Sequence, residues 1–480
     1  MFRKDSIAVK EWLETSNKAL LVTGARQIGK TWLIRDEIDK SGYKRFEINF
    51  INQPDMVEYL NAEMSAEDFL VKLRLIMPEE CKPHETVVFL DEIQKCPEIV
   101  TKIKFLVDEG SFKYAMSGSL LGVELKGIAS APVGYLRVLK MYPMDFEEFM
   151  IANGVSTTTL NMLKDCFDEC KPVDDFVHEK LMSMFFVYLI VGGMPDAVKK
   201  YIETKDIREV DKIQKDIVDL YRVDFSQYEE DKKLKLKSIY DIIPAELNKQ
   251  NKKFVFTMLD KELKFDRYEN SFLWLKDAGV VIPVYNAEAP LIPLKAGKSS
   301  NVFKLFSSDI GLLTSAYPAE TKMELISKNG EVNNGAHFEN AVAQQLLAND
   351  FDLYFCKRSK VGELDFLIEL SGKVVPIEVK SGKGYKSHKA LDNYMNIEDY
   401  HLEKAYVFST FNVEKEGKII YLPIYMSYLL KEPKIDQLIV DLDISGLEIV
   451  TKILLKEVLY VRSRNQSTGF YIAGPERRAA

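Results

Sequence analysis

The chain of 480 residues lacks several features that would identify its class at once. Its five cysteines are few, odd in number and scattered, so they do not suggest a disulfide framework and suit a reducing compartment. The longest apolar run, residues 182–191, is about half the ~20 residues that a membrane-spanning helix needs. Residues 1–6 do not resemble a signal peptide. We therefore expect a cytoplasmic protein with no membrane partner.

An excess of positive charge is also missing. The net charge of −8 argues against a protein that coats nucleic acid with its whole surface, although it leaves room for local basic patches. What the chain does have is length and apolar content. Hydrophobic residues make up 46% of it, and about 150 residues per domain gives a prior of about three domains. We expect a globular protein of several domains.

The most specific motif lies near the N-terminus. An apolar stretch, residues 20–23, leads into Gly-Ala-Arg-Gln-Ile-Gly-Lys-Thr, the G-x-x-x-x-G-K-T pattern of a loop that wraps nucleotide phosphates. Its glycines let the backbone turn tightly, Lys30 supplies a charge for the β/γ oxygens, and the Thr31 hydroxyl can ligate Mg²⁺. A glycine turn in an ordinary core is the alternative, but the apolar strand before the loop and the helix pattern after it favour ATP binding. The predicted ATP-binding residues here are Gly24, Ala25, Arg26, Gln27, Ile28, Gly29, Lys30, Thr31 and Trp32.

A second signal follows further along the chain. Residues 85–90 form a mostly apolar stretch that ends in Asp91 and Glu92, as a parallel strand buried on both faces would. Taken alone, this pattern is more typical of a plain strand end followed by a helix start. After a phosphate-binding loop, it indicates that Asp91 holds Mg²⁺ together with Thr31. Glu92 is then placed to polarise a water for attack on the γ-phosphate.

A third strand is expected at residues 112–116 and ends in Ser117, Gly118 and Ser119. The carboxyl ends of parallel strands meet at one edge of an open α/β sheet, and ligands bind at that edge. The sequence therefore predicts hydroxyl groups beside the nucleotide.

With these motifs, the chain resembles the prokaryotic AAA-type ATPases that carry a C-terminal domain of unknown function. The likeness extends over about residues 1–445 and rests on the segments 24–31, 90–94, 117–121, 133–149, 192–195 and 221–224. It implies ATP hydrolysis, with Ser117 as the polar residue that reads the γ-phosphate beside the catalytic Lys30 and Glu92. It also implies that the helical residues 151–230 form a lid that closes on the nucleotide. Many relatives have an arginine directly after the glycine equivalent to Gly134, where Tyr135 stands here, so no arginine finger is assigned.

The segment 232–267 differs in charge from the rest of the chain. It holds ten Lys and Arg residues against five acids, a local balance of +5 in a chain of −8. A helix is expected at 268–278, ended by Gly279 and followed by a strand at 280–285, which is the order of a winged helix. The resemblance also implies a winged helix. Lysines on solvated helix faces are the alternative to phosphate contact, and DNA is the partner that this segment favours.

A second group of polar residues lies near the C-terminus. A helix with Glu339 near its start precedes strands expected at 353–356, 363–370 and 374–380. Because side chains alternate along a strand, Glu378 and Lys380 project together, and Asp365 from the neighbouring strand can join them. The carboxylates of Asp365 and Glu378 can then converge on a divalent metal, and the lysine on the attacking water.

The spacing of Asp365, Glu378 and Lys380 resembles the PD-(D/E)xK pattern of restriction-endonuclease-like folds, with Glu339 at the helical acidic position. Leu364 stands where the pattern often has a proline. An acid and a lysine two residues apart are also common on an exposed strand face. The resemblance favours the fold, whereas cleavage of phosphodiesters stays open because such domains also serve in binding alone.

We therefore predict an α/β protein with a P-loop AAA-type parallel-sheet ATPase domain (1–150), a helical lid (151–230), a winged-helix-like domain (231–325), a restriction-endonuclease-like α/β domain (326–432), and a closing strand with an unassigned tail (433–480). The predicted function is ATP hydrolysis coupled to a C-terminal domain that binds nucleic acid, with nuclease activity left open. The alternative is a nucleotide-dependent switch whose C-terminal domain is catalytically inactive and binds a protein partner. Assembly into a homo-oligomer is consistent with both.

Overall fold

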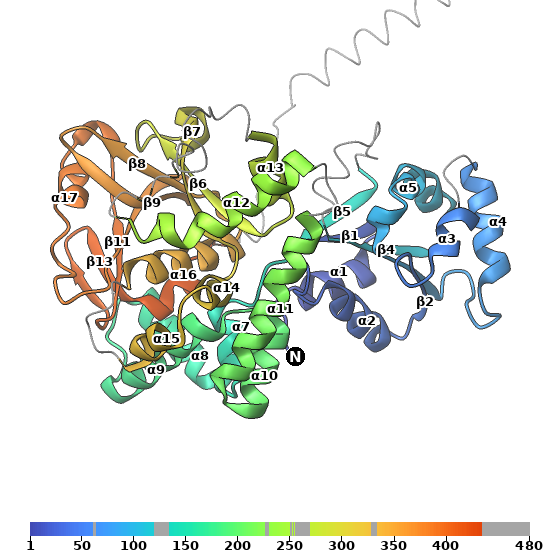
Figure 1. Ribbon diagram of the computed structural model, residues 1–480, viewed down its shortest axis with the longest axis horizontal. Coiled ribbons are helices and arrows are strands. Elements are labelled where there is room, and N and C mark those ends of the chain that lie inside the picture. Colours follow the sequence, from blue (N-terminus) through green and yellow to red (C-terminus); the bar gives the residue numbers. More distant parts are fainter. Residues whose placement is uncertain are drawn as a thin grey trace, which may run out of the picture. The chain divides into compact units, whose positions relative to one another are not determined.

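Two β-sheets organise the described part of the chain (Figure 1). The computed structural model describes residues 1–60, 64–119, 134–225, 230–249, 252, 254, 269–327 and 334–433. Residues Met1–Glu432 form one compact unit. The predicted closing strand and tail lie outside the described residues, except for Pro433.

Within the described residues, the first sheet has five strands, and every pair is parallel. The order across the sheet is β2-β3-β4-β1-β5. The strands are β1 (Ala19–Thr23), β2 (Lys44–Asn49), β3 (Thr86–Asp91), β4 (Lys113–Ser117) and β5 (Leu136–Lys140). Strand β3 is buried along its whole length, which explains its continuous apolar sequence. The strands predicted before the phosphate loop, before Asp91 and before Ser117 are confirmed as β1, β3 and β4.

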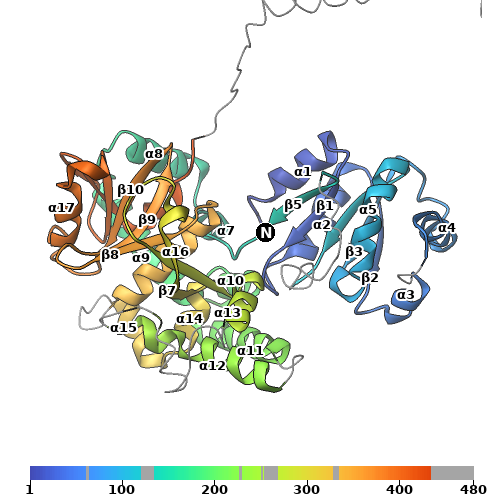
Figure 2. The same ribbon diagram turned by 90° about the horizontal axis from the view of Figure 1, so that it is seen from above.

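Helices cover both faces of this sheet, and Figure 2 shows its strands side by side among α1, α2 and α5. Leu20 and Val22 face a core shared with α1 and α2, whereas Leu21 faces a core shared with α4 and α5, as strand alternation requires. The helices are α1 (Ser6–Thr15), α2 (Lys30–Ser41), α3 (Pro54–Tyr59), α4 (Ala66–Ile76) and α5 (Glu98–Glu109). The helix predicted after the phosphate loop is confirmed as α2.

The segment between the two sheets is helical, as predicted for residues 151–230. Its helices are α7 (Phe146–Ala152), α8 (Thr157–Asp168), α9 (Asp175–Val191), α10 (Pro195–Thr204) and α11 (Ile207–Phe225), followed by α12 (Glu230–Leu247). Asp145 begins α7 with a capping box, because its side chain accepts the Glu148 N–H while the Glu148 side chain accepts the Asp145 N–H. Among the described helices, none combines the length and hydropathy of a membrane-spanning segment. All five cysteines are free thiols.

The turn between α9 and α10 brings three distant segments together. A Cβ on Gly193 would lie 1.9 Å from the carbonyl oxygen of Met144, so no larger residue fits without displacement of the chain. Gly193 donates its N–H to Asp309 Oδ2 (2.6 Å), and its carbonyl accepts the N–H of Met144 (2.7 Å). The motifs at 142–149 and 192–195 therefore meet in one packed turn.

The second sheet has eight strands in the described residues and mixes parallel with antiparallel pairs. The order across it is β12-β13-β11-β10-β9-β8-β6-β7. The strands are β6 (Val281–Ala287), β7 (Lys298–Ser307), β8 (Tyr354–Arg358), β9 (Gly362–Leu370), β10 (Lys373–Val379), β11 (Ala405–Ser409), β12 (Glu414–Glu416) and β13 (Ile419–Pro423). The helices beside it are α13 (Glu269–Asp277), α14 (Ile310–Ser315), α16 (Gly335–Ala348) and α17 (Lys389–Met395), whereas α15 (Ala319–Ser327) packs against α9. Strands β8, β9 and β10 confirm the three strands predicted near the C-terminus.

The helix and strand expected in the winged helix are present as α13 and β6. However, β6 pairs with β8 in parallel as well as with β7 in antiparallel orientation. The β6–β7 hairpin therefore extends the second sheet and does not stand apart as a wing. The sheet crosses the boundary that we predicted at residue 325, because β7 at one edge and its neighbour β6 come from the preceding segment.

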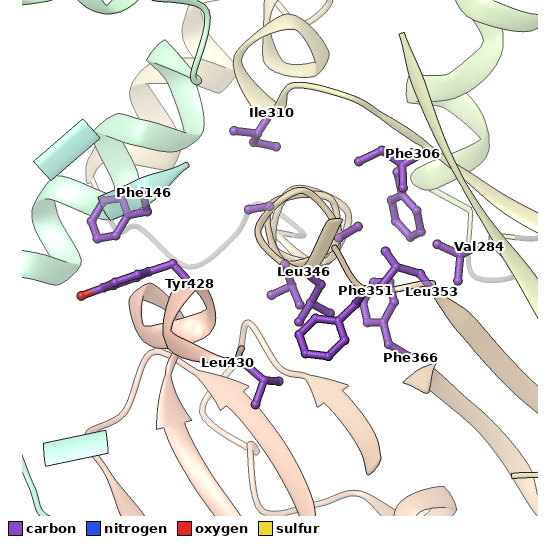
Figure 3. Packing of buried hydrophobic residues seen from close by; sticks show 14 of the residues in the cluster. Phe146, Val284, Phe306, Ile310, Leu346, Phe351, Leu353, Phe366, Tyr428 and Leu430 are labelled. Carbon is purple, nitrogen blue, oxygen red and sulfur yellow. The ribbon is translucent and has the colours of Figure 1, made fainter. Parts of the chain in front are cut away.

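Helix α16 lies at the centre of the core beside the second sheet. Every residue from Ala336 to Leu346 is buried, including the polar ones. Figure 3 shows Leu346, Phe306 and Phe366 around this helix, and all three belong to the same core. A helix buried on all sides also places Glu339 inside the protein.

Candidate functional site

The loop between β1 and α2 places the predicted ATP-binding residues at the carboxyl edge of the first sheet. Gly24 has a left-handed backbone (φ +134°), and a Cβ there would lie 2.3 Å from the carbonyl oxygen of Met141. Only glycine lets the loop pass so close to this segment. The loop ends at the N-terminus of α2, where free N–H groups and the helix dipole favour phosphate.

Lys30 is buried at the first position of α2. Its ammonium donates to the carbonyl oxygens of Gly24 (3.0 Å) and Ala25 (2.7 Å). Burial lowers the pKa of Lys30 to about 8, although the carboxylates of Glu92 and Asp91 oppose this shift. The positive charge therefore lies inside the loop, where phosphate oxygens would take over from the carbonyls.

Asp91, at the end of β3, is bonded to three other elements. Its carboxylate accepts hydrogen bonds from the Thr31 hydroxyl (3.0 and 3.2 Å), the Ser117 hydroxyl and the Asn49 amide (2.8 Å). In the register of the sheet, Asn49 and Ser117 stand beside Asp91 on its two neighbouring strands. Thr31 and Asp91, the predicted Mg²⁺ ligands, are within hydrogen-bond distance of each other, so their oxygens fit one shared ion.

Glu92 follows Asp91 in a left-handed conformation (φ +57°), which is uncommon for a residue with a side chain and often marks a functional turn. Its carboxylate accepts a hydrogen bond from the Gln94 amide, which also lies 3.4 Å from the Ser119 hydroxyl. Ser119 in turn accepts a hydrogen bond from Arg26 Nε (3.1 Å). A polar chain thus links the predicted base to the phosphate loop.

A cavity of about 930 Å³ opens beside the loop. This volume lies within the ~300–1,000 Å³ that is typical of small-molecule sites. Lys30, Thr31 and Glu92 form part of its wall, Trp32 adds an aromatic side chain, and α10 contributes Lys199 from the segment predicted as a lid. These groups fit a nucleoside triphosphate with Mg²⁺.

Helix α11 holds the phosphate loop in place. Asp224 forms an ion pair with Arg26 (Oδ1 to Nη1, 2.7 Å), and the Tyr221 hydroxyl donates to the carbonyl oxygen of Arg26 (3.2 Å). Asp224 is only 2% exposed. The loop is therefore fastened to the helix that leads toward the second sheet.

The residues of the second predicted site come together in the second sheet. The Lys380 ammonium donates to Glu378 Oε1 (2.7 Å), and Asp365 Oδ2 accepts the backbone N–H of Val379 (2.9 Å). Glu339 joins them from α16, and both Glu339 and Glu378 are 5% exposed. The convergence that strand alternation predicts is therefore present in the structure.

Three further lysines enter this cluster. Lys304, on β7, is 1% exposed, and its ammonium lies 3.0 Å from Glu363, 3.9 Å from Asp365 and 4.0 Å from Glu339. The remaining pairs are Lys252 with Glu339 and Lys357 with Glu363 (2.8 Å). Each carboxylate of the predicted site therefore has a lysine of this chain nearby.

Burial changes the pKa values of the cluster. It raises the pKa of Glu378 to about 8, and the charge of Asp365 adds to this shift. Burial likewise raises the pKa of Glu339. Burial alone would lower the pKa of Lys304, but the surrounding carboxylates, Glu339 foremost, outweigh it and raise the pKa. Lys304 is therefore a permanent cation at neutral pH.

These surroundings do not fit the divalent metal predicted at Asp365 and Glu378. Carboxylate oxygens bind Mg²⁺ or Ca²⁺ at about 2.0–2.6 Å and need open lone pairs, whereas the Lys304 ammonium already lies among them. In the ranges that the structure describes, no three His, Cys, Asp or Glu side chains are grouped as metal ligands. Metal ligation here stays a prediction that the geometry does not favour.

Six of the ten Lys and Arg residues in the segment 232–267 lie outside the described side chains. Two of its described lysines have acidic partners within the chain, Lys249 with Glu246 and Lys252 with Glu339. Because these charges are already paired, they do not form the open basic surface that phosphate contact needs. DNA binding by this segment stays a prediction.

The sequence patterns do not single out Asn49, Gln94 or Lys304. Asn49 ends β2, and a polar residue at the carboxyl end of a parallel strand is a signal that identifies it. Lys304 carries no such signal, because a lysine between Phe303 and Leu305 looks like an ordinary solvent-facing strand position.

Three family models match separate parts of the chain. An AAA domain model matches residues 16–150, and two models, each described as a domain of unknown function (DUF8612 and DUF4143), match residues 182–323 and 334–426. No curated protein matches the chain. Residues 16–150 are therefore an AAA-type P-loop domain, which supports ATP binding, whereas these matches assign no activity to the two later segments.

Solved structures give only weak likenesses. The Walker-type ATPase PABY2304 of Pyrococcus abyssi is 13% identical, with 65% of this chain and 95% of that chain covered and a TM-score of 0.39. The RuvB Holliday junction branch migration motor of Thermotoga maritima is 15% identical over 59% and 89% of the two chains, with a TM-score of 0.27. Drosophila ORC bound to DNA is 11% identical over 70% and 97%, with a TM-score of 0.26. At these scores no property of those proteins is assigned to this chain.

Proposed function

We propose that the chain binds ATP with Mg²⁺ in the cavity beside residues 24–31 and hydrolyses it. The observation that carries this proposal is the hydrogen bonding of Thr31 and Ser117 to Asp91 directly beside the phosphate loop. Thr31 and Asp91 would hold Mg²⁺, which when bound neutralises charge on the β- and γ-phosphates. Lys30 would exchange its two carbonyl partners for phosphate oxygens.

We assign Glu92 to the attacking water. Its carboxylate is held by Gln94, so this hydrogen bond has to open before Glu92 can accept one from water. The water oxygen then bonds to the γ-phosphorus, the bond to the β–γ bridging oxygen breaks, and the water proton passes to Glu92. Ser117, bonded to Asp91, lies where the loss of the γ-phosphate changes the local charge.

The binding half of this proposal is tested by Lys30→Ala. We expect the affinity for a fluorescent ATP analogue to fall by about tenfold or more, because a charge-assisted contact to phosphate is lost. Lys40→Ala is the matched control, since Lys40 is on the same helix but pairs with Asp36 at the surface. Equal affinities of both variants and the wild-type protein would remove Lys30 from the site.

We further propose that α11 transmits the state of the nucleotide site to the rest of the chain. Arg26 belongs to the phosphate loop, yet its guanidinium pairs with Asp224 of α11. A phosphate bound in the loop competes with Asp224 for this cation. Nucleotide binding and the attachment of α11 to the loop are therefore linked.

We also propose a role for the C-terminal part. The paired lysines of the second cluster favour a domain that binds a partner without cleaving it, so we favour a nucleotide-dependent switch over a nuclease. DNA is the partner that the sequence favours, and a protein is the alternative. The ATPase rate with and without DNA distinguishes the two: stimulation that weakens with salt supports DNA, whereas an unchanged rate at low salt contradicts it.

A further inference from the structure

We infer that the Lys304 ammonium takes the place of a divalent metal in the second cluster, so that this site is an internal network of ion pairs and not a metal-dependent nuclease centre. The inference concerns the C-terminal cluster and does not depend on ATP hydrolysis.

Lys304 reaches the carboxylates from a strand that the PD-(D/E)xK pattern does not include. Its ammonium lies within 4.0 Å of Glu339, Glu363 and Asp365, which come from α16 and β9. The ammonium also lies over the ring of Phe355, 5.1 Å from its centroid. With 1% exposure, Lys304 has no route to water that avoids repacking.

Among the described residues, the carboxylates of the cluster do not outnumber its ammonium groups. Four carboxylates, those of Glu339, Glu363, Asp365 and Glu378, meet four ammonium groups, those of Lys252, Lys304, Lys357 and Lys380. Even with all four carboxylates ionised the cluster has no excess negative charge, and the raised pKa of Glu378 reduces its negative charge further. A divalent cation is held by an excess of negative charge, which this arrangement does not provide.

A metal placed between Glu339 and Asp365 would also approach the Lys304 ammonium closely. Like charges at such distances repel strongly in a buried, low-dielectric site. The metal could enter only if Lys304 left its carboxylate partners, and an unpaired buried ammonium is costly. Lys304 and the metal therefore exclude each other.

One oxygen of Glu339 and one of Glu378 are buried without a hydrogen-bond partner among the described residues. These oxygens show that the cluster retains lone pairs aimed into its interior. If the Lys304 charge were removed, they would be free to ligate a cation. We therefore predict that these carboxylates bind no metal in the wild-type protein but form a metal site when Lys304 is replaced.

The test is Mn²⁺ binding by the full-length, nucleotide-free protein, measured from the electron paramagnetic resonance signal of free Mn²⁺. All proteins would carry Thr31→Ala, so that the nucleotide site does not contribute. We expect Asp365→Asn to leave Mn²⁺ binding unchanged. We expect Lys304→Met to gain a site at least about tenfold tighter than any in the parent protein, and Lys304→Met with Asp365→Asn to lose it again.

Lys357→Met is the matched control, because it removes an exposed lysine of the same cluster and leaves Lys304 in place. It should gain no Mn²⁺ site. If the protein with Thr31→Ala alone binds Mn²⁺ and Asp365→Asn abolishes that binding, the inference is wrong. This comparison can be made even if Lys304→Met does not fold. A folded Lys304→Met without a new site would equally contradict it. Phosphate release from ATP, measured on proteins with Thr31 intact, reports separately on the nucleotide site.

Discussion

At the scale of single residues, Gly193 and Asp309 fix the junction between the helical segment and the second sheet. Asp309 is completely buried, and its carboxylate accepts hydrogen bonds from Gly193, Leu312 and the side chain of Gln344. It also begins α14 as its N-cap. Because Met144 and Asp309 both contact Gly193, a larger side chain at position 193 would displace the chain at all three positions.

We predict that Gly193→Ala destabilises the protein by at least about 2–3 kcal/mol, because the new methyl group would overlap the Met144 carbonyl. The urea midpoint of unfolding measures this loss. Gly382→Ala is the control, since a Cβ there meets nothing within 4 Å. Equal midpoints for the two variants would show that the turn can relax.

Asp309 should give the stability a distinct pH dependence. Burial raises its pKa from 3.8 to about 6, so the folded state holds the proton more tightly than the unfolded state. The contribution of Asp309 to the free energy of unfolding is therefore largest below about pH 4. It decreases as the pH rises to about 6, by about 3 kcal/mol at most. Relative to Asp309→Asn, the wild-type melting temperature should decline over this window. If the melting temperatures of the two proteins changed with pH in the same way, the raised pKa of Asp309 would be contradicted.

At the scale of elements, the nucleotide site is assembled by three strand ends and supported by α11. The register of β2, β3 and β4 sets Asn49, Asp91 and Ser117 in a row. Helix α11 contributes Tyr221 and Asp224 to the back of the loop. The strands position the polar side chains of the site. Helix α11 contributes Asp224, whose ion pair with Arg26 the nucleotide has to break.

Asp224→Asn should therefore tighten ATP binding by about three- to tenfold, because Arg26 can then bind phosphate without first breaking an ion pair. Titration with a fluorescent ATP analogue measures the change. Asp219→Asn, on the same helix but paired with Arg222 at the surface, should leave the affinity unaltered. Weaker or equal binding by Asp224→Asn would mean that the ion pair does not compete with nucleotide.

At the scale of the whole molecule, periodicity and motif context were sufficient for three strands of the first sheet, β1, β3 and β4, but not for β2 and β5. The phosphate loop and the strand ends at Asp91 and Ser117 lie where the patterns predict them, because a parallel sheet buried on both faces has a clear sequence signature. The joining of β6 to β8 is not predictable in this way, since no local pattern encodes which distant strand will pair. Lys304 is missed for the same reason: its partners on α16 and β9 are distant in sequence.

The central proposal is that the phosphate loop and Glu92 form an ATP-hydrolysing site. Its most direct test is phosphate release by wild-type protein and Glu92→Gln, with bound ATP measured in the same samples. We predict that Glu92→Gln binds ATP with wild-type affinity and releases phosphate about 10²–10⁴-fold more slowly, because the amide cannot accept the water proton. An unchanged rate of phosphate release in Glu92→Gln would contradict the proposal.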